Sequence, residues 1–476
     1  MPDQIRFGTD GWRGLIADDY TFAKVRRAAQ GTAEYLLTRS KNPLAIVGYD
    51  CRFASEQFAQ TVADIFAANG VRSLVFDRPS PTQVVSWSVV DRKATGGAMI
   101  TASHNPYLFN GFKYKPETGS SAPKDVILEL EKRINAIAER APSGTGSDLV
   151  STYDPRPSYF AQVGRMVDLA AIRDSGMHIV HEVMHGAGYG YITQLLAGGK
   201  TTVTELHSDR NASFGGINPE PIRPNIDSAL AYMQAGGNNL GICTDGDADR
   251  VGIIDEAGRF INQLQVYALL MVYLYEVRGL HGPVVKTVNM TSMADRLAKE
   301  YGVELFEVPV GFPNIAPKMM ETGAVIGGEE SGGYAVQGHI TERDGILVGL
   351  MFADMMIKKG KPLSALLSDL QARVGPHEYA RHDFHLPRET YDTERKAILG
   401  ALARNEPAEL AGVKVDHIRS DDGIKFYMAD GSWVLLRTSG TEPLIRVYAE
   451  APSAAAVQAL LSGVEELAGL SKHAHV

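Results

Sequence analysis

Short β-branched segments alternate with segments of helical periodicity along most of the chain. LAIVGYD (44–50) predicts a strand, SEQFAQTVADIFAANG (55–70) predicts a helix that ends at a glycine, and RSLVFD (72–77) predicts another strand. The pattern is typical of α/β units with mixed, largely parallel sheets. The same alternation returns at 177–184, 282–288 and 303–310.

Changes in composition divide the chain into four predicted domains. The segment APSGTGSD (141–148) is small and polar, and DPRPSY (154–159), which carries two prolines, follows it. The turn DEAGR (255–259) precedes a long apolar helix, and alternating strands in the last part favour an α+β domain there. We therefore expect domains at 1–154, 155–256, 257–373 and 374–476.

Length, charge and cysteine content narrow the class of protein. The 476 residues exceed what one core organises, and a formal charge of -9 without a long Lys or Arg run argues against nucleic acid as a partner. Cys51 and Cys243 form neither a disulfide framework nor a C-x-x-C metal pair, which favours a reducing compartment. No signal-like or membrane-spanning apolar segment is present, so we expect a cytoplasmic protein with no membrane partner.

The segment GGAMITASHNPYLFNGFKY (96–114) contains the first candidate for chemistry. It begins as a strand, and Ser103 follows the carboxyl end of that strand, where open α/β sheets place reactive groups. Asn110-Gly111 predicts a tight hairpin turn that would direct Lys113 back toward the serine. A serine that only satisfies a turn backbone would show the same pattern.

The segment LGICTDGDADRVGIID (240–255) contains three aspartates at alternate positions between two predicted strands. Asp245, Asp247 and Asp249 would point the same way in an extended loop, and their mutual repulsion predicts a bound Mg²⁺ ion. An EF-hand is the competing metal site, but its sixth position requires Gly and is Arg250 here. A solvated acidic turn is the alternative without a metal.

Two further loops carry groups suited to a sugar phosphate. GGEESGGY (327–334) places Glu329 and Ser331 in a glycine-flanked loop that suits sugar hydroxyls, although an exposed polar loop would look similar. LLRTSGTEPLIRVYAE (435–450) offers guanidinium groups, hydroxyls and backbone N–H groups that suit a phosphate, although a surface turn would also fit. The candidate phosphate-binding residues are Arg437, Thr438, Ser439, Gly440, Thr441 and Arg446.

In this order, TASHNP, DGDADR, GGEESGG and RTSGTEP with Arg446 resemble the four signature loops of the α-D-phosphohexomutase superfamily. FGTDGWRG (7–14) and FGGINPEP (214–221) are also similar to segments of that family, so the resemblance spans nearly the whole chain. It is closest to bacterial-type phosphoglucomutases. The resemblance implies four domains around a central cleft, the first three sharing an α/β topology and the last α+β.

The resemblance also assigns roles to individual positions. It implies that Ser103 carries the phosphoryl group and joins the three aspartates at Mg²⁺, and that Glu329 and Ser331 hold sugar hydroxyls. Arg437, Ser439, Gly440, Thr441 and Arg446 would hold the phosphate that does not react. The cations near the phosphoserine would be Arg13, Lys113 and Arg250, and His104 is a candidate general acid or base whose position could equally be structural.

Two positions depart from the family pattern. Phosphomannomutase-like members often have His where this chain has Gly333, and many relatives have Lys where it has Pro313. The Glu-Glu-Ser loop is more similar to the loop of glucose-preferring members than to the Glu-Gln-Ser loop of glucosamine-type members.

The function implied is a phosphoglucomutase, a monomer or homodimer, that interconverts glucose 1- and 6-phosphate through glucose 1,6-bisphosphate. A phosphomannomutase or dual-specificity mutase is the first alternative. A hexose 1,6-bisphosphate synthase that uses a separate phosphoryl donor is the second. A catalytically silent binding protein is disfavoured, because the serine, the aspartates and the arginines are all intact.

Overall fold

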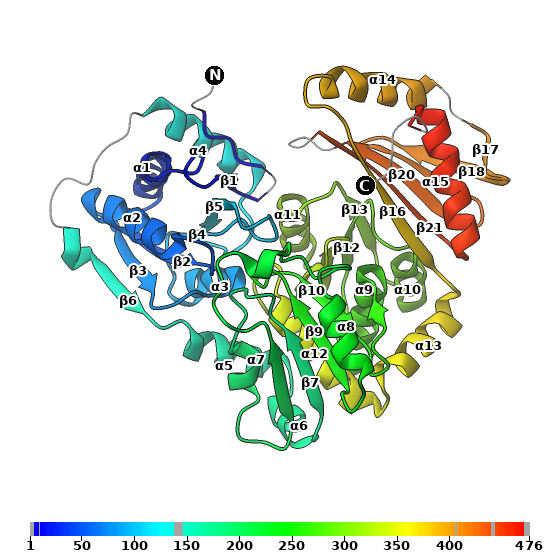
Figure 1. Ribbon diagram of the computed structural model, residues 1–476, viewed down its shortest axis with the longest axis horizontal. Helices are drawn as coiled ribbons and strands as arrows, with labels where there is room; N and C mark the ends of the chain where they lie inside the picture. Colours follow the sequence, from blue (N-terminus) through cyan, green and yellow to red (C-terminus); the bar gives the residue numbers. More distant parts are fainter. Residues whose placement is uncertain (1–3, 9, 138–145, 405–406, 439–442, 471–476) are drawn as a thin grey trace. The chain divides into compact units, whose positions relative to one another are not determined.

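The computed structural model describes residues 4–8, 10–137, 146–404, 407–438 and 443–470 (Figure 1). They form two compact units. The larger unit comprises Met1–Val285 and Gly311–Leu366, and the smaller unit comprises Lys286–Val310 and Leu367–Val476.

The first sheet is built from β1 (Trp12–Leu15), β2 (Leu44–Tyr49), β3 (Arg72–Phe76), β4 (Gly96–Ile100), β5 (Phe109–Pro116) and β6 (Val150–Tyr153). Its order is β1-β5-β4-β2-β3-β6. The pairs among β4, β2, β3 and β6 are parallel, whereas β5 runs antiparallel to β4 and β1, so the predicted mixed sheet is confirmed. The helices of this part are α1 (Phe22–Arg39), α2 (Ser55–Ala68), α3 (Thr82–Asp91) and α4 (Lys124–Ala136).

Glycines bring α3 close to the first sheet. A Cβ on Gly48 of β2 would lie 2.4 Å from Val85 Cγ2, and a Cβ on Gly97 of β4 would lie 2.9 Å from Val89 Cγ2. Because these strand positions carry no side chain, the helix packs directly on the backbone of β2 and β4. This approach places the first residue of α3, Thr82, beside the loop that carries the three aspartates.

The prediction of a hairpin turn at Asn110-Gly111 is wrong. Both residues lie inside β5, and the connection between β4 and β5 is residues 101–108. The Asn110 amide is buried and donates to Ser55 Oγ at 2.9 Å. Gly111 is needed for close packing, because a Cβ there would lie 2.5 Å from the carbonyl oxygen of Thr101 and 2.6 Å from that of Trp12.

The second sheet is built from β7 (His178–Glu182), β8 (Thr202–Leu206), β9 (Leu240–Thr244), β10 (Val251–Ile254) and β11 (Phe260–Ile261). Its order is β11-β10-β9-β7-β8, with β7 parallel to β8 and β9 and the remaining pairs antiparallel. The helices of this part of the chain are α5 (Arg156–Met166), α6 (Leu169–Asp174), α7 (Tyr191–Leu195), η2 (Phe214–Gly216) and α8 (Asp227–Gln234), whereas η1 (Gly146–Leu149) precedes β6 and contacts α2 in the first part.

The third sheet is built from β12 (Val284–Thr287), β13 (Leu305–Val308), β14 (Ile326–Glu329) and β15 (Gly333–Val336). Its order is β13-β12-β14-β15, and β14 and β15 form an antiparallel pair around the Glu-Glu-Ser loop. The helices of this part of the chain are α9 (Gln263–Val272), η3 (Tyr273–Val277), α10 (Met293–Tyr301), α11 (Phe312–Thr322), α12 (Gly345–Lys359) and α13 (Leu363–Val374).

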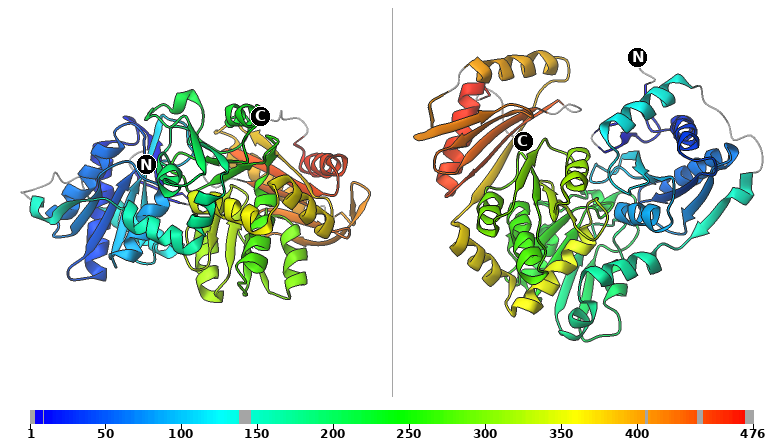
Figure 2. Two further views of the ribbon diagram at one scale, coloured as in Figure 1. Left: turned by 90° about the horizontal axis from the view of Figure 1, so that it is seen from below. Right: turned by 180° about the vertical axis from the view of Figure 1, so that it is seen from behind.

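The fourth sheet lies in the smaller unit and consists of β16 (Glu378–His385), β17 (Glu409–Leu410), β18 (Val413–Arg419), β19 (Ile424–Met428), β20 (Trp433–Thr438) and β21 (Leu444–Ala451). Its order is β16-β21-β20-β19-β18-β17, and every pair is antiparallel. Helices α14 (Tyr391–Arg404) and α15 (Ala454–Ala468) cover one face of this sheet (Figure 2). The α+β character predicted for the last part is therefore confirmed.

Buried charges connect β12 and β13 to the fourth sheet within the smaller unit. Glu307 Oε2 on β13 is 3.1 Å from Lys425 Nζ on β19 and 3.5 Å from Lys286 Nζ on β12. Burial lowers the pKa of Lys425 to about 8, although Glu307 acts to raise it. This cluster holds β13 against the sheet that carries Arg437 and Arg446.

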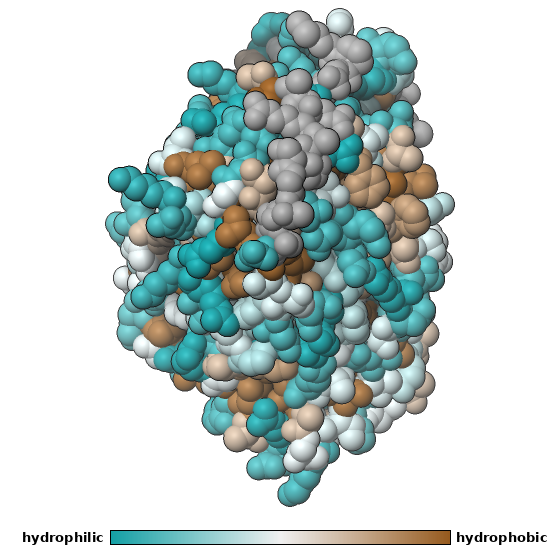
Figure 3. Space-filling model, turned by 90° about the vertical axis from the view of Figure 1, so that its left-hand side faces the viewer, coloured by the Kyte–Doolittle hydropathy of each residue, from teal (hydrophilic) through white to brown (hydrophobic). Residues whose placement is uncertain are grey.

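The face of the molecule shown in Figure 3 is largely hydrophilic, with apolar residues in separate small groups. Within the described parts of the chain, no helix combines the length and the apolar character that crossing a membrane requires.

Candidate active site

Three of the candidate loops in the larger unit begin where strands end. Ser103 follows β4, Asp245 follows β9, and Glu329 is the last residue of β14. The carboxyl ends of strands in open α/β sheets are the usual places for ligand-binding groups. The structure brings Ser103 and the three aspartates together as the sequence predicts.

Ser103 is completely buried and has a left-handed backbone, with φ at +53°. A non-glycine residue in this conformation stores on the order of 1 kcal/mol of strain and persists where its surroundings fix it. The Ser103 amide donates to Thr101 Oγ1 at 2.8 Å, and Ser103 Oγ donates to Asp245 Oδ2 at 3.0 Å. The serine hydroxyl therefore points directly at the acidic loop.

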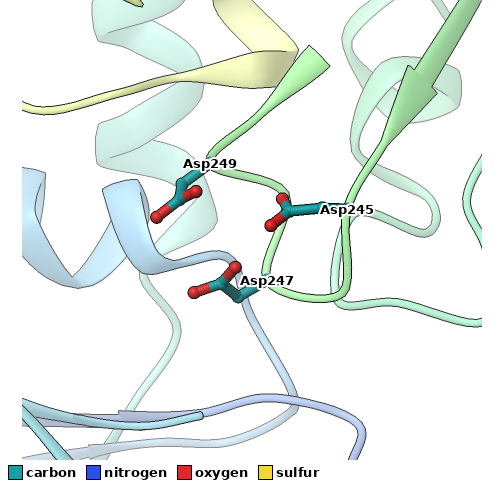
Figure 4. A group of neighbouring side chains, drawn as sticks. All are labelled: Asp245, Asp247 and Asp249. Carbon is teal, nitrogen blue, oxygen red and sulfur yellow. The ribbon is translucent and has the colours of Figure 1, made fainter. Parts of the chain in front are cut away.

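The carboxylates of Asp245, Asp247 and Asp249 are buried and converge from the loop between β9 and β10 (Figure 4). Their oxygens lie within 4.8 Å of one another. Asp247 Oδ1 and Asp249 Oδ1 have no hydrogen-bond partner among the described residues. Burial, followed by the charges of Asp247 and Asp249, raises the pKa of Asp245 well above its ordinary value. Orphaned carboxylate oxygens in a cluster of like charges fit a hard divalent cation such as Mg²⁺.

Lys113 compensates part of this negative charge. It is buried on β5, and its Nζ lies 2.9 Å from Asp247 Oδ2 and 3.3 Å from Asp249 Oδ2. Burial acts to raise the pKa of Asp247, but Lys113 and a 2.6 Å hydrogen bond from Thr82 Oγ1 outweigh it and bring the pKa below its ordinary value. The sequence predicts that Lys113 is directed toward the serine by a turn; in the structure it lies on β5 and contacts Asp247 and Asp249.

Arg343 is a central residue of the site that the sequence reasoning missed. Its Nη2 lies 2.8 Å from Asp249 Oδ2, and its Nη1 lies 3.1 Å from Glu329 Oε1, so it joins the metal loop to the sugar loop. The same guanidinium contacts Asp10, whose pKa three cations hold well below the ordinary value although burial acts to raise it. Arg343 precedes α12 in the sequence TERDG, where a run of charged residues directly before an apolar helix was the available signal.

Lys115 and Glu342 were missed as well. Both side chains are fully buried, and Lys115 Nζ lies 2.5 Å from Glu342 Oε2, which also accepts a hydrogen bond from Ser121 Oγ at 2.8 Å. Lys115 and Lys113 are two residues apart on β5 and so lie on the same face of the strand. A lysine repeated at alternate strand positions was the signal for this pair.

The remaining predicted cations surround the serine loop. Arg13 donates to Asn105 Oδ1, two residues after the serine. Arg250 Nη1 lies 3.1 Å from Glu220 Oε1, while its backbone N–H donates to Asp245 Oδ1 at 3.0 Å. His104 Nδ1 is 3.4 Å from Ser103 Oγ, and burial, followed by the charges of Arg250 and Arg13, lowers the pKa of His104 well below its ordinary value. These surroundings favour the neutral form of the imidazole.

The sugar loop is preorganised by Glu329, which is almost fully buried. Ser331 Oγ donates to Glu329 Oε1 at 2.8 Å, and Arg343 binds the same oxygen. A Cβ on Gly333 would lie 2.2 Å from Arg343 Cδ and 2.7 Å from its Cγ. Position 333 is glycine because the side chain of Arg343 occupies the space that a side chain at 333 would need.

The candidate phosphate cradle lies in the smaller unit. Arg437 on β20 and Arg446 on β21 are direct cross-strand partners, so their guanidinium groups share one face of the sheet. Arg437 Nε donates to Asp422 Oδ1 at 2.9 Å, and Arg446 Nε lies 3.5 Å from Asp383 Oδ2. Two guanidinium groups on one face of the sheet suit a site that binds a phosphate. Ser439, Gly440 and Thr441 lie outside the described residues.

The fold and the site together define a class of α/β enzyme that places a serine beside a metal-binding acidic loop. Comparison with known protein families makes this specific. Phosphoglucomutase/phosphomannomutase α/β/α domains I, II and III match residues 4–141, 157–258 and 262–374, and the C-terminal domain of that family matches 394–467. The chain therefore belongs to the phosphoglucomutase/phosphomannomutase family of the α-D-phosphohexomutase superfamily, a family of metal-dependent mutases with a four-domain architecture.

Individual relatives agree on the family and differ in the sugar. The chain is 32% identical over 453 residues to the phosphoglucomutase/phosphomannomutase of Thermococcus kodakarensis, with 94% of each chain covered. It is 29% identical to the phosphoglucosamine mutase of Solidesulfovibrio magneticus, with 98% of each covered. A solved structure from Thermus thermophilus, whose protein carries a provisional phosphomannomutase name, superposes with a TM-score of 0.86 at 34% identity, covering 98% of this chain and 99% of that one.

Proposed function

We propose that the protein is a phosphoglucomutase that interconverts glucose 1-phosphate and glucose 6-phosphate. In this proposal Ser103 carries the phosphoryl group, and glucose 1,6-bisphosphate is the intermediate. The observation that carries the proposal is the 3.0 Å hydrogen bond from Ser103 Oγ to Asp245, within a buried acidic cluster that has orphaned oxygens.

The residues around Ser103 suit phosphoryl transfer, which depends on positioning and on neutralising charge. Asp245, Asp247 and Asp249 would hold Mg²⁺ together with an oxygen of the phosphorylated Ser103, and the ion would supply charge stabilisation at the phosphoryl oxygens. Lys113 and Arg343 already lie at the aspartate oxygens and are placed to share that role. The neutral His104 beside Ser103 Oγ is placed to accept or return a proton.

The sugar-binding side supports a hexose held by its hydroxyls. Glu329 and Ser331 form a hydrogen-bonded pair on a buried loop, and Arg343 fixes the glutamate. Where phosphomannomutase-like members often have His, this chain has Gly333, and Arg343 occupies the space. The Glu-Glu-Ser loop and this replacement favour glucose over mannose and glucosamine.

A substrate panel tests the proposal. Activity would be measured on the 1-phosphates of glucose, mannose and glucosamine with Mg²⁺ and a trace of the matching 1,6-bisphosphate, and the products would be identified. We expect the highest kcat/KM on glucose 1-phosphate. A higher kcat/KM on another sugar would overturn the glucose assignment, and net release of bisphosphate from an added phosphoryl donor would replace the mutase with a synthase.

The contact between Gly333 and Arg343 makes a testable prediction. Gly333→Ala should push the stem of Arg343 away from Asp249 and Glu329, because the added methyl would overlap Cγ and Cδ of the arginine. A displacement near 1 Å at a reacting site costs roughly 100-fold, so we expect kcat/KM for glucose 1-phosphate to fall by about 10- to 100-fold. Gly164→Ala on α5 is the control, since a Cβ there meets only Leu169 at 3.4 Å. Equal activity in the two variants would contradict the role given to Gly333.

The paired arginines of the cradle make a second prediction. Arg446→Lys keeps the charge but removes the planar fork, which should cost about 1 to 3 kcal/mol if the contact with phosphate is bidentate. More glucose 1,6-bisphosphate should then escape before it rephosphorylates Ser103. The variant should need roughly 5- to 150-fold more added glucose 1,6-bisphosphate for half-maximal turnover at saturating substrate. Arg395→Lys on α14 of the same unit is the control, and an unchanged requirement in Arg446→Lys would remove Arg446 from the cradle.

A further inference from the structure

The turn that carries Ser103 is buried only over residues 101–103, and its own backbone N–H groups bond few of its carbonyls. Residues 101–108 connect β4 to β5, and Ser103 sits within them in the left-handed conformation. Backbone N–H groups within the hairpin bond the carbonyls of Ala102 and Pro106. Further donors to the carbonyls of this turn therefore stabilise it, because a carbonyl left without enough donors away from water is costly.

Arg52, which follows the adjacent strand β2, supplies those donors. Its side chain is completely buried, and one guanidinium reaches carbonyls on both sides of the turn. Nη2 donates to the carbonyl oxygens of Ser103 at 2.5 Å and Asn105 at 2.7 Å. Nη1 donates to those of Pro106 at 2.9 Å and Phe109 at 3.0 Å.

Asp50 completes a closed circuit of hydrogen bonds around Ser103. Its Oδ2 accepts from Arg52 Nε at 3.1 Å and from Thr101 Oγ1 at 2.7 Å. The same threonine oxygen accepts the Ser103 amide at 2.8 Å. The N–H of Ser103 is thus held through Thr101 and its carbonyl through Arg52, and both connections end on one buried carboxylate.

We propose that Arg52 is a positioning residue for phosphoryl transfer, which fixes the backbone of Ser103 so that its hydroxyl stays directed at the acidic loop. Asp50 and Thr101 are its partners in this role. The catalytic part of this inference rests on the proposed function, whereas the positioning itself rests only on the hydrogen bonds.

The chemistry of the side chain explains why arginine is used here. Its guanidinium carries five donors in one plane, and four carbonyls plus a carboxylate use all of them. Lysine has three donors on a single nitrogen and cannot span the turn. Burying a charge is expensive compared with apolar packing, so general stability alone is a poor reason for an arginine at this position.

The first test compares Arg52→Lys with the parent protein. Both would be phosphorylated with glucose 1,6-bisphosphate, and transfer from Ser103 to glucose 1-phosphate would be followed in a single turnover. We expect transfer to slow by about 100-fold, as for a reacting group displaced by about 1 Å, with the hexose-phosphate Kd changed by less than about threefold. Hydrogen exchange of segment 101–109 should accelerate in the variant while exchange in other segments stays at the parent level.

A matched control removes a similar arginine elsewhere. Arg173 also donates to a backbone carbonyl, that of Leu195, through Nε at 2.9 Å and Nη2 at 2.7 Å. Arg173→Lys should lose these bonds without changing phosphoryl transfer or the exchange of segment 101–109. An equal slowing in the control would assign the effect to general destabilisation and overturn the proposal.

A second pair of variants keeps the test decisive if Arg52→Lys does not fold. Thr101→Val preserves the shape of the side chain and breaks the circuit at the Ser103 amide, whereas Thr101→Ser keeps the hydroxyl. We expect about 10-fold slower transfer and faster exchange of segment 101–109 in Thr101→Val, and near-parent behaviour in Thr101→Ser. Parent-like transfer and exchange in Thr101→Val would overturn the positioning role.

The failure of this inference is distinguishable from failure of the proposed function. If the parent protein does not take up phosphate on Ser103, the proposed function is wrong. In that case, hydrogen exchange of segment 101–109 in the same variants tests the positioning role independently of catalysis. Unchanged exchange in Arg52→Lys would overturn it.

Discussion

Ser103→Ala should lose nearly all mutase turnover and keep its affinity for hexose phosphate. In the proposed function the serine hydroxyl is the acceptor and donor of the phosphoryl group, and alanine cannot carry it. Removing a nucleophile of this kind lowers kcat on the order of 10⁴- to 10⁶-fold. Binding should persist, because Glu329, Ser331 and the paired arginines are untouched. Coupled turnover assays and calorimetric titration with glucose 6-phosphate would measure the two quantities.

Ser103→Gly is the companion variant, because glycine adopts a φ of +53° without strain. It should be as inactive as Ser103→Ala but at least as stable, which separates the loss of the hydroxyl from backbone effects. Ser73→Ala is the control, since Ser73 is a buried serine whose hydroxyl has no hydrogen-bond partner within the described chain. Phosphate found by peptide mass analysis only at residues other than Ser103 would contradict the prediction.

Asp247→Asn should weaken Mg²⁺ binding without unfolding the protein. The substitution preserves shape and removes one of three buried negative charges at the metal loop. Metal affinity follows the number of charged ligands, so the Mg²⁺ concentration for half-maximal activity should rise by about 10- to 100-fold. Excess Mg²⁺ should restore part of the activity. A Mg²⁺ titration of turnover, together with a thermal melt, measures this effect.

Asp255→Asn is the matched control for the loss of a buried aspartate in the same domain. Asp255 is fully buried and bonds the backbone N–H groups of Ala257 and Arg259 in the turn after β10. That variant should lower Tm while leaving the Mg²⁺ dependence as in the parent. Activity of Asp247→Asn that matches the parent at every Mg²⁺ concentration would mean that the three aspartates form only a polar turn.

The order of elements and the four loops are predictable from the sequence because both are local patterns. The strand at 44–50, the helix at 55–70 and the strand at 72–77 are present as β2, α2 and β3, within a residue or two at each end. Ser103 and Asp245 each follow a strand that the periodicity locates, and the family resemblance implies that Ser103 and the three aspartates meet.

The ionic network behind these loops was not predictable, because its members come from distant segments. Lys115 and Glu342 are 227 residues apart in sequence, and Arg343 and Asp10 are 333 apart. No local pattern shows that such residues will share one buried cluster. Arg52 was detectable in principle, since it follows a predicted strand just as Ser103 does.

The wrong hairpin at Asn110-Gly111 shows that one dipeptide can serve two purposes. Asn-Gly favours a tight turn because both residues tolerate positive φ. Here the amide of Asn110 donates to Ser55 Oγ, and Gly111 leaves space for the carbonyl oxygens of Trp12 and Thr101. Tertiary packing therefore accounts for both residues here, and neither forms a turn.

The left-handed backbone of Ser103 also bears on how this family diverges. Selection for stability alone would favour glycine at this position, because glycine fits φ of +53° and serine does not. In the proposed function, the need for a phosphoryl-carrying hydroxyl would oppose that drift. A relative with glycine at position 103 and with Arg52, Asp50 and Thr101 intact would keep the fold and the sugar-binding loops. Such a chain would mark a lineage that had given up catalysis.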